Sequence, residues 1–371
     1  DWSSDVCSSD LKNRLVASAA ISAALALTLA GCSDSGTDTG ADTGASGAGI
    51  SGSIKSSGSS AQKNAMAEWI NAFQTANPDV TIDYQANGSG AGIQDFINDQ
   101  TAFGGSDAAI TGEDKTAADA RCAGGEAINI PMVGGAIAVA YNVEGVDSLT
   151  LTPDVIAGIF NSTITRWNDP QIADLNDGVT LPDAAIAQFH RSDESGTTVN
   201  FTEYLAATAP DIWTYEVGKA WTAPGGQGSK GSDGVASSLT STPNSIGYVE
   251  LSFVLDGDLK SASVDNGAGA VEATSANAAT AIEAATVTGE GNNLSLALDP
   301  TIAAAGAYPI VLVTYEITCT AGLSAQDAAV VKPFMEYAAS DAGQGILEGI
   351  GYVPITGELL TKVQAAIDAI A

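Results

Sequence analysis

Short apolar runs alternate with helical patterns along most of this chain. The side chains of Met66, Ile70 and Phe73 recur at i, i+4 and i+7, which predicts a helix with one apolar face. Residues 80–84 (VTIDY) are typical of a strand, and residues 93–97 again carry apolar side chains on one helical face. This repeated exchange of strand and helix predicts an α/β fold.

Two apolar runs, residues 135–141 and 308–315, are longer than the others and rich in β-branched side chains. Such runs are typical of strands that are buried on both faces. We interpret them as the two crossings between two lobes. The first lobe would comprise residues 54–136 and 314–371, and the second lobe residues 137–313. The length of the chain also favours two domains over one.

The amino-terminal region has the pattern of a targeting signal. Lys12 and Arg14 precede an apolar run, residues 15–30, that is too short and too weakly flanked for a transmembrane helix. The run ends in the letters LAGC, which resemble the lipobox of bacterial lipoproteins. In such proteins the signal is cut before the cysteine, here Cys32, and the cysteine carries lipid. A plain secretory signal with a chance cysteine is the alternative.

We therefore expect residues 12–31 to be a lipoprotein signal peptide and Cys32 to be lipidated. Residues 32–53 are small and polar, so they have nothing to bury and should form a flexible tether. Residues 1–11 fit no targeting pattern, and we interpret them as a tag or a sequence artefact.

The chain is strongly acidic, with 44 acidic residues against 13 basic ones and a formal net charge of −31. This charge excludes ordinary nucleic-acid binding, which basic patches drive. It also repels anionic ligands at long range, so an anion site in this protein must work through local hydrogen bonds. The charge favours solubility, while the lipid would provide the anchor.

Two of the four cysteines, Cys122 and Cys319, fall in the mature part after the lipidation candidate. An even pair outside the cytoplasm suggests a disulfide bond. Two buried free thiols are the alternative.

Two polar segments open helical patterns, residues 88–92 (GSGAG) and 191–197 (RSDESGT). A helix amino terminus presents unpaired N–H groups and a partial positive charge, so it favours an anion. Arg191 offers a planar fork that suits bidentate contact with an oxyanion, and Asp193 is placed to hold that fork. Ser89 either caps its helix or binds a ligand. Together these segments predict a site for a small tetrahedral anion.

Three further residues near predicted strand ends are candidates for the same site. The hydroxyl of Ser60 and the N–H of Ala61 precede the first helix, and capping of that helix is the alternative role for Ser60. Asp107 follows a strand of small residues and is a poor ligand for an anion unless that anion carries a proton. It would then accept a bond from that proton and repel an unprotonated ligand. A plain surface acid is the alternative for Asp107.

The sequence favours neither catalysis nor a bound metal or other cofactor. His190 is the only histidine, and no nucleophile and base can be assembled around it, so we expect it to be structural. No His or Cys pair has the spacing of zinc ligands. Residues 226–231 fit the dinucleotide motif G-x-G-x-x-G, but no apolar strand precedes them.

Taken together, these segments resemble the PstS family, the phosphate-binding lipoproteins of bacterial ABC phosphate transporters. The resemblance extends from about residue 54 to residue 355. The motifs that carry it are GSS at 58–60, YQANGS at 84–89, FGGSD at 103–107, RWND at 166–169, RSDESGT at 191–197, KGSDG at 230–234 and IGYVE at 246–250.

The resemblance implies a two-lobed periplasmic-binding-protein fold of type II, with two crossover strands as the hinge. It implies a monomer without catalytic activity, held by lipid on the outer face of the cell membrane, which delivers phosphate to the transmembrane subunits of an ABC permease. The implied phosphate ligands are Ser60, the N–H of Ala61, Ser89, Asp107, Arg191, Ser195, the N–H of Gly196 and Thr197, with Asp193 paired to Arg191.

The chain departs from the family pattern at Ala61, where some members carry an aromatic residue, and at Glu194, where some carry glycine. Glu194 adds negative charge near the anion, which affects the expected affinity but not the class of ligand. Two other functions stay open at this point: a secreted phosphatase related to the family, and a binder of another oxyanion such as sulfate or molybdate. The second would have no use for Asp107.

Overall fold

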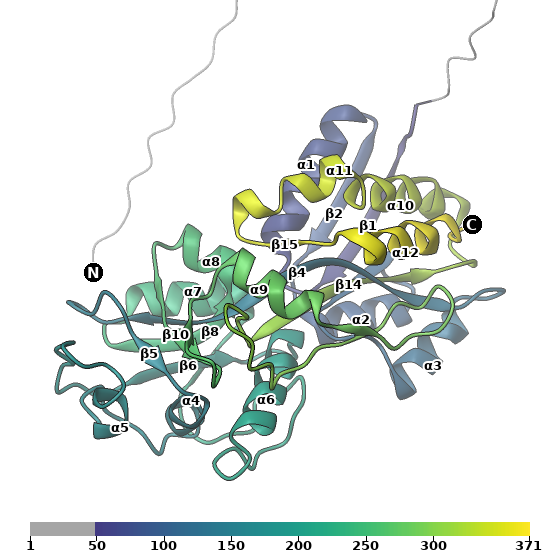
Figure 1. Ribbon diagram of the computed structural model, residues 1–371. Helices are drawn as coiled ribbons and strands as arrows, with labels where there is room; N and C mark the ends of the chain where they lie inside the picture. Colours follow the sequence, from purple (N-terminus) through teal and green to yellow (C-terminus); the bar gives the residue numbers. More distant parts are fainter. Residues whose placement is uncertain (1–48) are drawn as a thin grey trace, which may run out of the picture. The chain divides into compact units, whose positions relative to one another are not determined.

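The computed structural model describes residues 49–371, so the predicted signal peptide, Cys32 and most of the tether lie outside the described residues. A ten-stranded mixed sheet runs through this part of the chain (Figure 1). Its strand order is β2-β1-β3-β14-β4-β8-β6-β7, and the short strands β9 (Lys260–Ser261) and β15 (Val353–Pro354) also pair with β4. The fold is the predicted two-lobed α/β periplasmic-binding fold.

The first lobe is built on the parallel strands β1 (Gly52–Gly58), β2 (Val80–Gln85) and β3 (Phe103–Ser106). Figure 1 shows its helices packed around these strands. The predicted apolar faces are buried: Met66 and Phe73 of α1 lie in the same hydrophobic core as Phe103 and Phe334. The helices of this lobe are α1 (Lys63–Ala76), α2 (Ser89–Ile97), α3 (Gly112–Arg121), α10 (Ala325–Ala338), α11 (Asp341–Gly345), the 3-10 turn η1 (Glu348–Ile350) and α12 (Gly357–Asp368).

The second lobe is built on the parallel strands β6 (Ala187–Arg191), β7 (Gln227–Ser229) and β8 (Ser245–Glu250). Its core is aromatic, and the ring centroids of Phe201 and Tyr248 lie 4.3 Å apart in a stacked pair. The other elements are the helices α4 (Pro153–Phe160), α5 (Pro170–Ala173), α6 (Gly196–Thr208), α7 (Gly231–Ser241), α8 (Leu251–Asp256) and α9 (Ser275–Glu283), and the strands β5 (Thr150–Leu151), β10 (Ser263–Asp265), β11 (Ala270–Val271), β12 (Thr286–Val287) and β13 (Leu296–Ala297).

Two long antiparallel strands, β4 (Ala127–Asn142) and β14 (Val311–Cys319), lie side by side in the centre of the sheet. They overlap the two predicted crossing runs but have different ends. β4 begins before residue 135, and β14 begins after Pro309, which has no N–H to donate to a ladder. Each side of this pair joins a different lobe, because β14 pairs with β3 and β4 pairs with β8.

Two large hydrophobic clusters lie in the described part of the chain. One draws its buried residues from 54–133 and 294–370, and the other mostly from 136–313. The lobe boundaries proposed from the sequence, at 136/137 and 313/314, stay a prediction.

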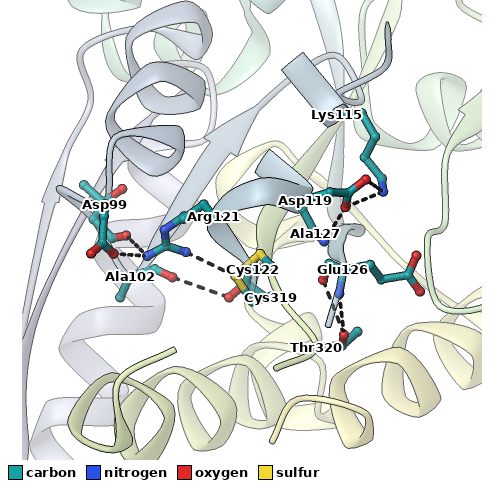
Figure 2. The surroundings of a disulfide bond; sticks show 12 residues. Asp99, Ala102, Lys115, Asp119, Arg121, Cys122, Glu126, Ala127, Cys319 and Thr320 are labelled. Atoms are coloured by element: carbon teal, nitrogen blue, oxygen red, sulfur yellow. Dashed lines mark hydrogen bonds and ion pairs between the residues drawn. A yellow bond between two sulfur atoms is a disulfide. The ribbon is translucent and has the colours of Figure 1, made fainter. Parts of the chain in front are cut away.

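A disulfide bond joins Cys122, after α3, to Cys319, the last residue of β14 (Figure 2). Their Cα atoms are 5.3 Å apart, and both residues are buried. The guanidinium of Arg121 lies beside the bond, where it donates to the carbonyl oxygen of Thr101 at 2.8 Å and pairs with Asp99 at 3.0 Å. The bond therefore closes a loop that contains the whole second lobe.

Within residues 49–371, no helix has both the length and the apolar character that a membrane span requires.

Candidate anion-binding site

The predicted site residues lie at the carboxyl ends of parallel strands of both lobes, where an open α/β sheet places its ligands. The loop after β1 carries Ser60 and Ala61, the loop after β2 leads to Ser89, and Asp107 follows β3 directly. Arg191 ends β6 in the second lobe. The structure brings these residues together and buries all of them: Ser60, Ala61, Ser89, Asp107, Arg191, Ser195, Gly196 and Thr197.

Asp107 is 3 % exposed and accepts three hydroxyl hydrogen bonds. Thr197 Oγ1 donates to its Oδ2 at 2.9 Å, Thr314 Oγ1 donates to its Oδ1 at 2.9 Å, and Ser59 Oγ donates to the same Oδ1. Burial raises the pKa of Asp107, while these three hydroxyls and the charge of Arg191 act to lower it. The alternative of a surface acid is wrong for Asp107, because its carboxyl is enclosed and fixed by donors.

The guanidinium of Arg191 is buried and clamped by Asp193. Its Nε and Nη2 donate to the two carboxylate oxygens at 2.8 and 2.5 Å, which leaves Nη1 directed toward Thr197 Oγ1 at 3.5 Å. Burial acts to raise the pKa of Asp193, but the hydrogen bonds and charge of Arg191 hold it below its ordinary value. The N–H of Gly231, at the start of α7, also donates to Asp193 at 2.9 Å. The free side of the fork therefore faces the site.

The amino terminus of α6 points into the site. Ser195 is its N-cap, and the side-chain Oγ accepts the N–H of Thr198 at 3.2 Å. The next N–H, that of Gly196, donates across the lobes to Ser89 Oγ at 3.0 Å. Ser89 Oγ also accepts the N–H of Asp107 at 3.3 Å. Ser89 is not the cap of α2, since Gly88 takes that position with a φ of 106°.

Ser60 does not cap α1, whose N-cap is Gln62. Instead its Oγ accepts the N–H of Ser232, the second residue of α7, at 2.9 Å and lies 3.0 Å from Ser232 Oγ. The N–H of Ala61 donates to Ser59 Oγ at 3.0 Å. Both predicted residues of this loop therefore face polar partners, and one of these partners lies in the other lobe.

Three residues of the site were missed by the sequence reasoning: Ser59, Ser232 and Thr314. Ser59 and Ser232 lie inside two of the motifs that carry the family resemblance, GSS at 58–60 and KGSDG at 230–234, and these motifs could have indicated them. The sequence does not indicate a role for Thr314, because this residue lies within an apolar run that is typical of a buried strand.

Glycines let the two loops meet. The N–H of Gly90 donates to the carbonyl oxygen of Glu194 at 3.0 Å, and a Cβ on Gly90 would collide with the side chain of Glu194. The carboxylate of Glu194 lies at an exposed position on the rim of a cavity of about 820 Å³, which Asp107, Lys219 and Tyr315 also line. This cavity reaches Asp107 from solvent.

The remaining candidates have structural roles. The ring of His190 stacks on Trp221 with centroids 4.9 Å apart, and its Nδ1 lies 2.9 Å from the carbonyl oxygen of Arg191. Residues 227–229 of the G-x-G-x-x-G segment form the edge strand β7. Among residues 49–371 there is no cluster of three or more His, Cys, Asp or Glu side chains that could hold a metal ion.

Comparison with known proteins agrees with this fold. Residues 43–342 match the PBP superfamily domain. The phosphate-binding protein PstS 3 of Mycobacterium tuberculosis is 43 % identical over 323 residues, which cover 86 % of this chain and 87 % of that protein. The phosphate-binding protein PstS of Pasteurella multocida is 31 % identical over 323 residues, covering 84 % and 89 %.

A solved structure with the same fold is that of a high affinity periplasmic phosphate-binding protein (PfluDING) with bound phosphate. It superposes with a TM-score of 0.68 at 22 % identity, over 84 % of this chain and 93 % of that one.

Proposed function

This chain belongs to the PstS family of phosphate-binding proteins, and we propose that it captures inorganic phosphate between its lobes and delivers it to an ABC permease. It is a binding protein of the transport type and not an enzyme. The proposed ligands are the hydroxyls of Ser60, Ser89, Ser195 and Thr197, the N–H groups of Ala61 and Gly196, the guanidinium of Arg191 and the carboxylate of Asp107.

The observation that carries the proposal is the buried carboxylate of Asp107 among convergent donors. Hydroxyls, two helix amino termini and one arginine supply donors for a small oxyanion. A carboxylate among them favours only an anion that brings its own proton. Phosphate carries such a proton at neutral pH and sulfate does not, so sulfate would set two acceptors against each other in a buried site.

The cellular setting is part of the proposal. The lipobox-like letters before Cys32 support a lipid anchor on the outer face of the cell membrane, and the family supports a permease as partner. We propose that the protein works there as a monomer and needs no cofactor.

Calorimetric titration of the full chain, stripped of bound anion, tests the ligand. We expect micromolar or tighter binding of phosphate and no heat from sulfate at neutral pH. Equal binding of both anions would point to a different oxyanion, and silence with phosphate would refute the proposal. Hydrolysis of a chromogenic phosphate ester that Ser195→Ala abolishes would instead establish a phosphatase.

A further inference from the structure

A second chain of hydrogen bonds joins the two lobes. Of its four residues, only Ala61, at one end of the chain, is also a proposed phosphate ligand. Glu250 ends β8 and Ser252 follows it in α8, both in the second lobe, while Tyr352 precedes β15 in the first. Ser252 Oγ lies 2.5 Å from Glu250 Oε2 and 3.0 Å from the Tyr352 hydroxyl, and that hydroxyl lies 2.5 Å from the carbonyl oxygen of Ala61. None of these four residues is more than 1 % exposed.

Counting protons along this chain shows that Glu250 must supply one. The three oxygen–oxygen contacts need three protons, but Ser252 and Tyr352 bring only one hydroxyl proton each. The carbonyl of Ala61 can only accept, so the proton of Tyr352 goes there. The proton of Ser252 can then fill its contact with either Tyr352 or Glu250, not both. A protonated Glu250 completes the set, with every donor pointing from Glu250 toward Ala61.

The surroundings of Glu250 favour the neutral acid. No ion pair among residues 49–371 includes Glu250, and its Oε1 has no hydrogen-bond partner. Its Oε2 accepts the N–H of Ser252 at 2.9 Å, as the N-cap of α8. Burial raises its pKa to about 8; the Ser252 and Tyr352 hydrogen bonds lower it, and Asp107 raises it.

The elements that pack against β8 carry titratable groups that do not bond to this carboxyl. They are Tyr141 on β4, His190 and Arg191 on β6, Glu203 and Tyr204 on α6, Asp233 on α7 and Asp256 on α8. The ionisable groups that act on Glu250 are therefore Asp107 and Tyr352.

We propose that Glu250 is a positioning residue for the loop that carries Ser60 and Ala61. Its protonated carboxyl donates a hydrogen bond to Ser252, Ser252 donates to Tyr352 and Tyr352 donates to the carbonyl of Ala61, so that phosphate binding is coupled to the uptake of one proton by Glu250. This inference rests on the proposed function. Parting of the lobes would separate Ser252 from Tyr352 and expose Glu250 to water, where it loses that proton to solvent. Closure on phosphate takes a proton back from solvent.

The sign of the pH effect follows from this linkage. The closed protein binds the proton of Glu250 more tightly than the open one, so closure is favoured at low pH. Affinity for phosphate falls as the pH rises above the ordinary pKa of an exposed glutamate, by at most about tenfold per pH unit. It levels off above about pH 8, the raised pKa of the buried Glu250. The ionisation of phosphate itself affects wild type and variants alike.

Glu316 provides a matched control. It is 1 % exposed, and burial raises its pKa also to about 8, but its neighbours lie in its own lobe. It pairs with Gly105 across the sheet, and the side chains of Gln62 and Tyr84 lie where a Cβ on Gly105 would be. Its proton is therefore not expected to depend on closure.

The experiment is calorimetric titration of the full chain with inorganic phosphate from pH 5.5 to 9, in two buffers of different ionisation enthalpy. For Glu250→Gln, whose amide donates permanently to Ser252, we expect phosphate affinity at least about tenfold above wild type at pH 6, because this variant takes up no proton on closure. We expect a flatter pH profile and uptake of up to one proton fewer. Glu316→Gln should keep the wild-type profile.

Three results would overturn the inference: wild-type profile and proton uptake in Glu250→Gln, a flattened profile in Glu316→Gln instead, or a wild-type profile in Tyr352→Phe. The last variant breaks the chain in the middle and serves if Glu250→Gln does not fold. It should lower affinity about tenfold at pH 6. Absence of phosphate binding by the wild type at every pH would refute the proposed function itself.

Discussion

At the scale of single residues, burial decides what each polar group of this protein does. Asp107 and Arg191 are among its many charged residues, yet they are 3 % and 2 % exposed. A buried charge is stable only where partners fix it, and each of these two has partners that leave one side open to the site. The ligand preference of the site therefore depends on which of its buried groups donate hydrogen bonds and which accept them.

Replacing Asp107 by Asn exchanges a pure acceptor for a group that also donates. We expect the ratio of the sulfate Kd to the phosphate Kd to fall by about 100-fold, because the penalty against an unprotonated anion disappears. Competition titrations with both anions measure this ratio. Asp79→Asn, at an exposed position before β2, should leave it unchanged, and an unchanged ratio in Asp107→Asn would remove the proton-sensing role.

Replacing Thr314 by Val keeps the side-chain shape but removes the donor to Asp107 Oδ1. The expected loss is about tenfold in phosphate affinity, since one hydrogen bond to a buried charged group is lost. The control is Thr318→Val on the same strand, whose hydroxyl reaches only the carbonyl of Ala102 at 3.4 Å. If the two variants bind phosphate equally well, Thr314 has no part in the site.

At the scale of elements, helix amino termini and glycine loops determine how closely the lobes meet. The first turns of α2 and α6 meet at the site: the N–H of Gly90 donates to the carbonyl oxygen of Glu194, and the N–H of Gly196 donates to the hydroxyl of Ser89. Gly196 has no room for a Cβ either, because Asp107 and Ser89 occupy it. Small residues at these positions are therefore a condition for the approach of the two helices.

Replacing Gly90 by Ala should hinder closure more than folding, since the added methyl group meets Glu194 of the other lobe. We expect a loss of at least tenfold in phosphate affinity with a thermal midpoint close to wild type. Gly345→Ala, where a Cβ would meet nothing within 4 Å, is the matched control. Affinity and midpoint that fall in parallel would indicate a folding defect instead.

At the scale of the whole molecule, the central strand pair and the disulfide bond hold the lobes to one framework. β4 and β14 pair with each other along most of their length, and each also pairs with a strand of one lobe. The disulfide bond encloses a sequence separation of 197 residues. Long loops lose the most entropy on closure, so this bond restricts the unfolded chain strongly.

Removing the bond with Cys122→Ser and Cys319→Ser should lower the free energy of unfolding by about 2–5 kcal/mol. Urea titrations with and without reductant measure the loss, and reductant should affect the wild type but not the double variant. An equal midpoint for all four samples would mean that the bond contributes nothing to stability. Phosphate affinity should remain unchanged, because both cysteines lie outside the site.

Much of the fold and the candidate site followed from the sequence alone, for a local physical reason. Apolar spacing predicted α1 and α2, and the polar segments at 88–92 and 191–197 follow strand ends, where a sheet gathers its ligands. The pairing of Arg191 with Asp193 is also local, since the two stand two residues apart.

Tertiary structure alone decided the rest, because those contacts join residues far apart in the chain. Thr314 reads as core, and only the pairing of β14 with β3 carries its hydroxyl to Asp107. The register of β14 also follows from its neighbours and not from its own apolar run. Glu250 reads as one acid among many, and only the fold removes water from it and places Tyr352 within reach of Ser252. The sequence determines which groups are present, and packing determines which of them lose water and meet.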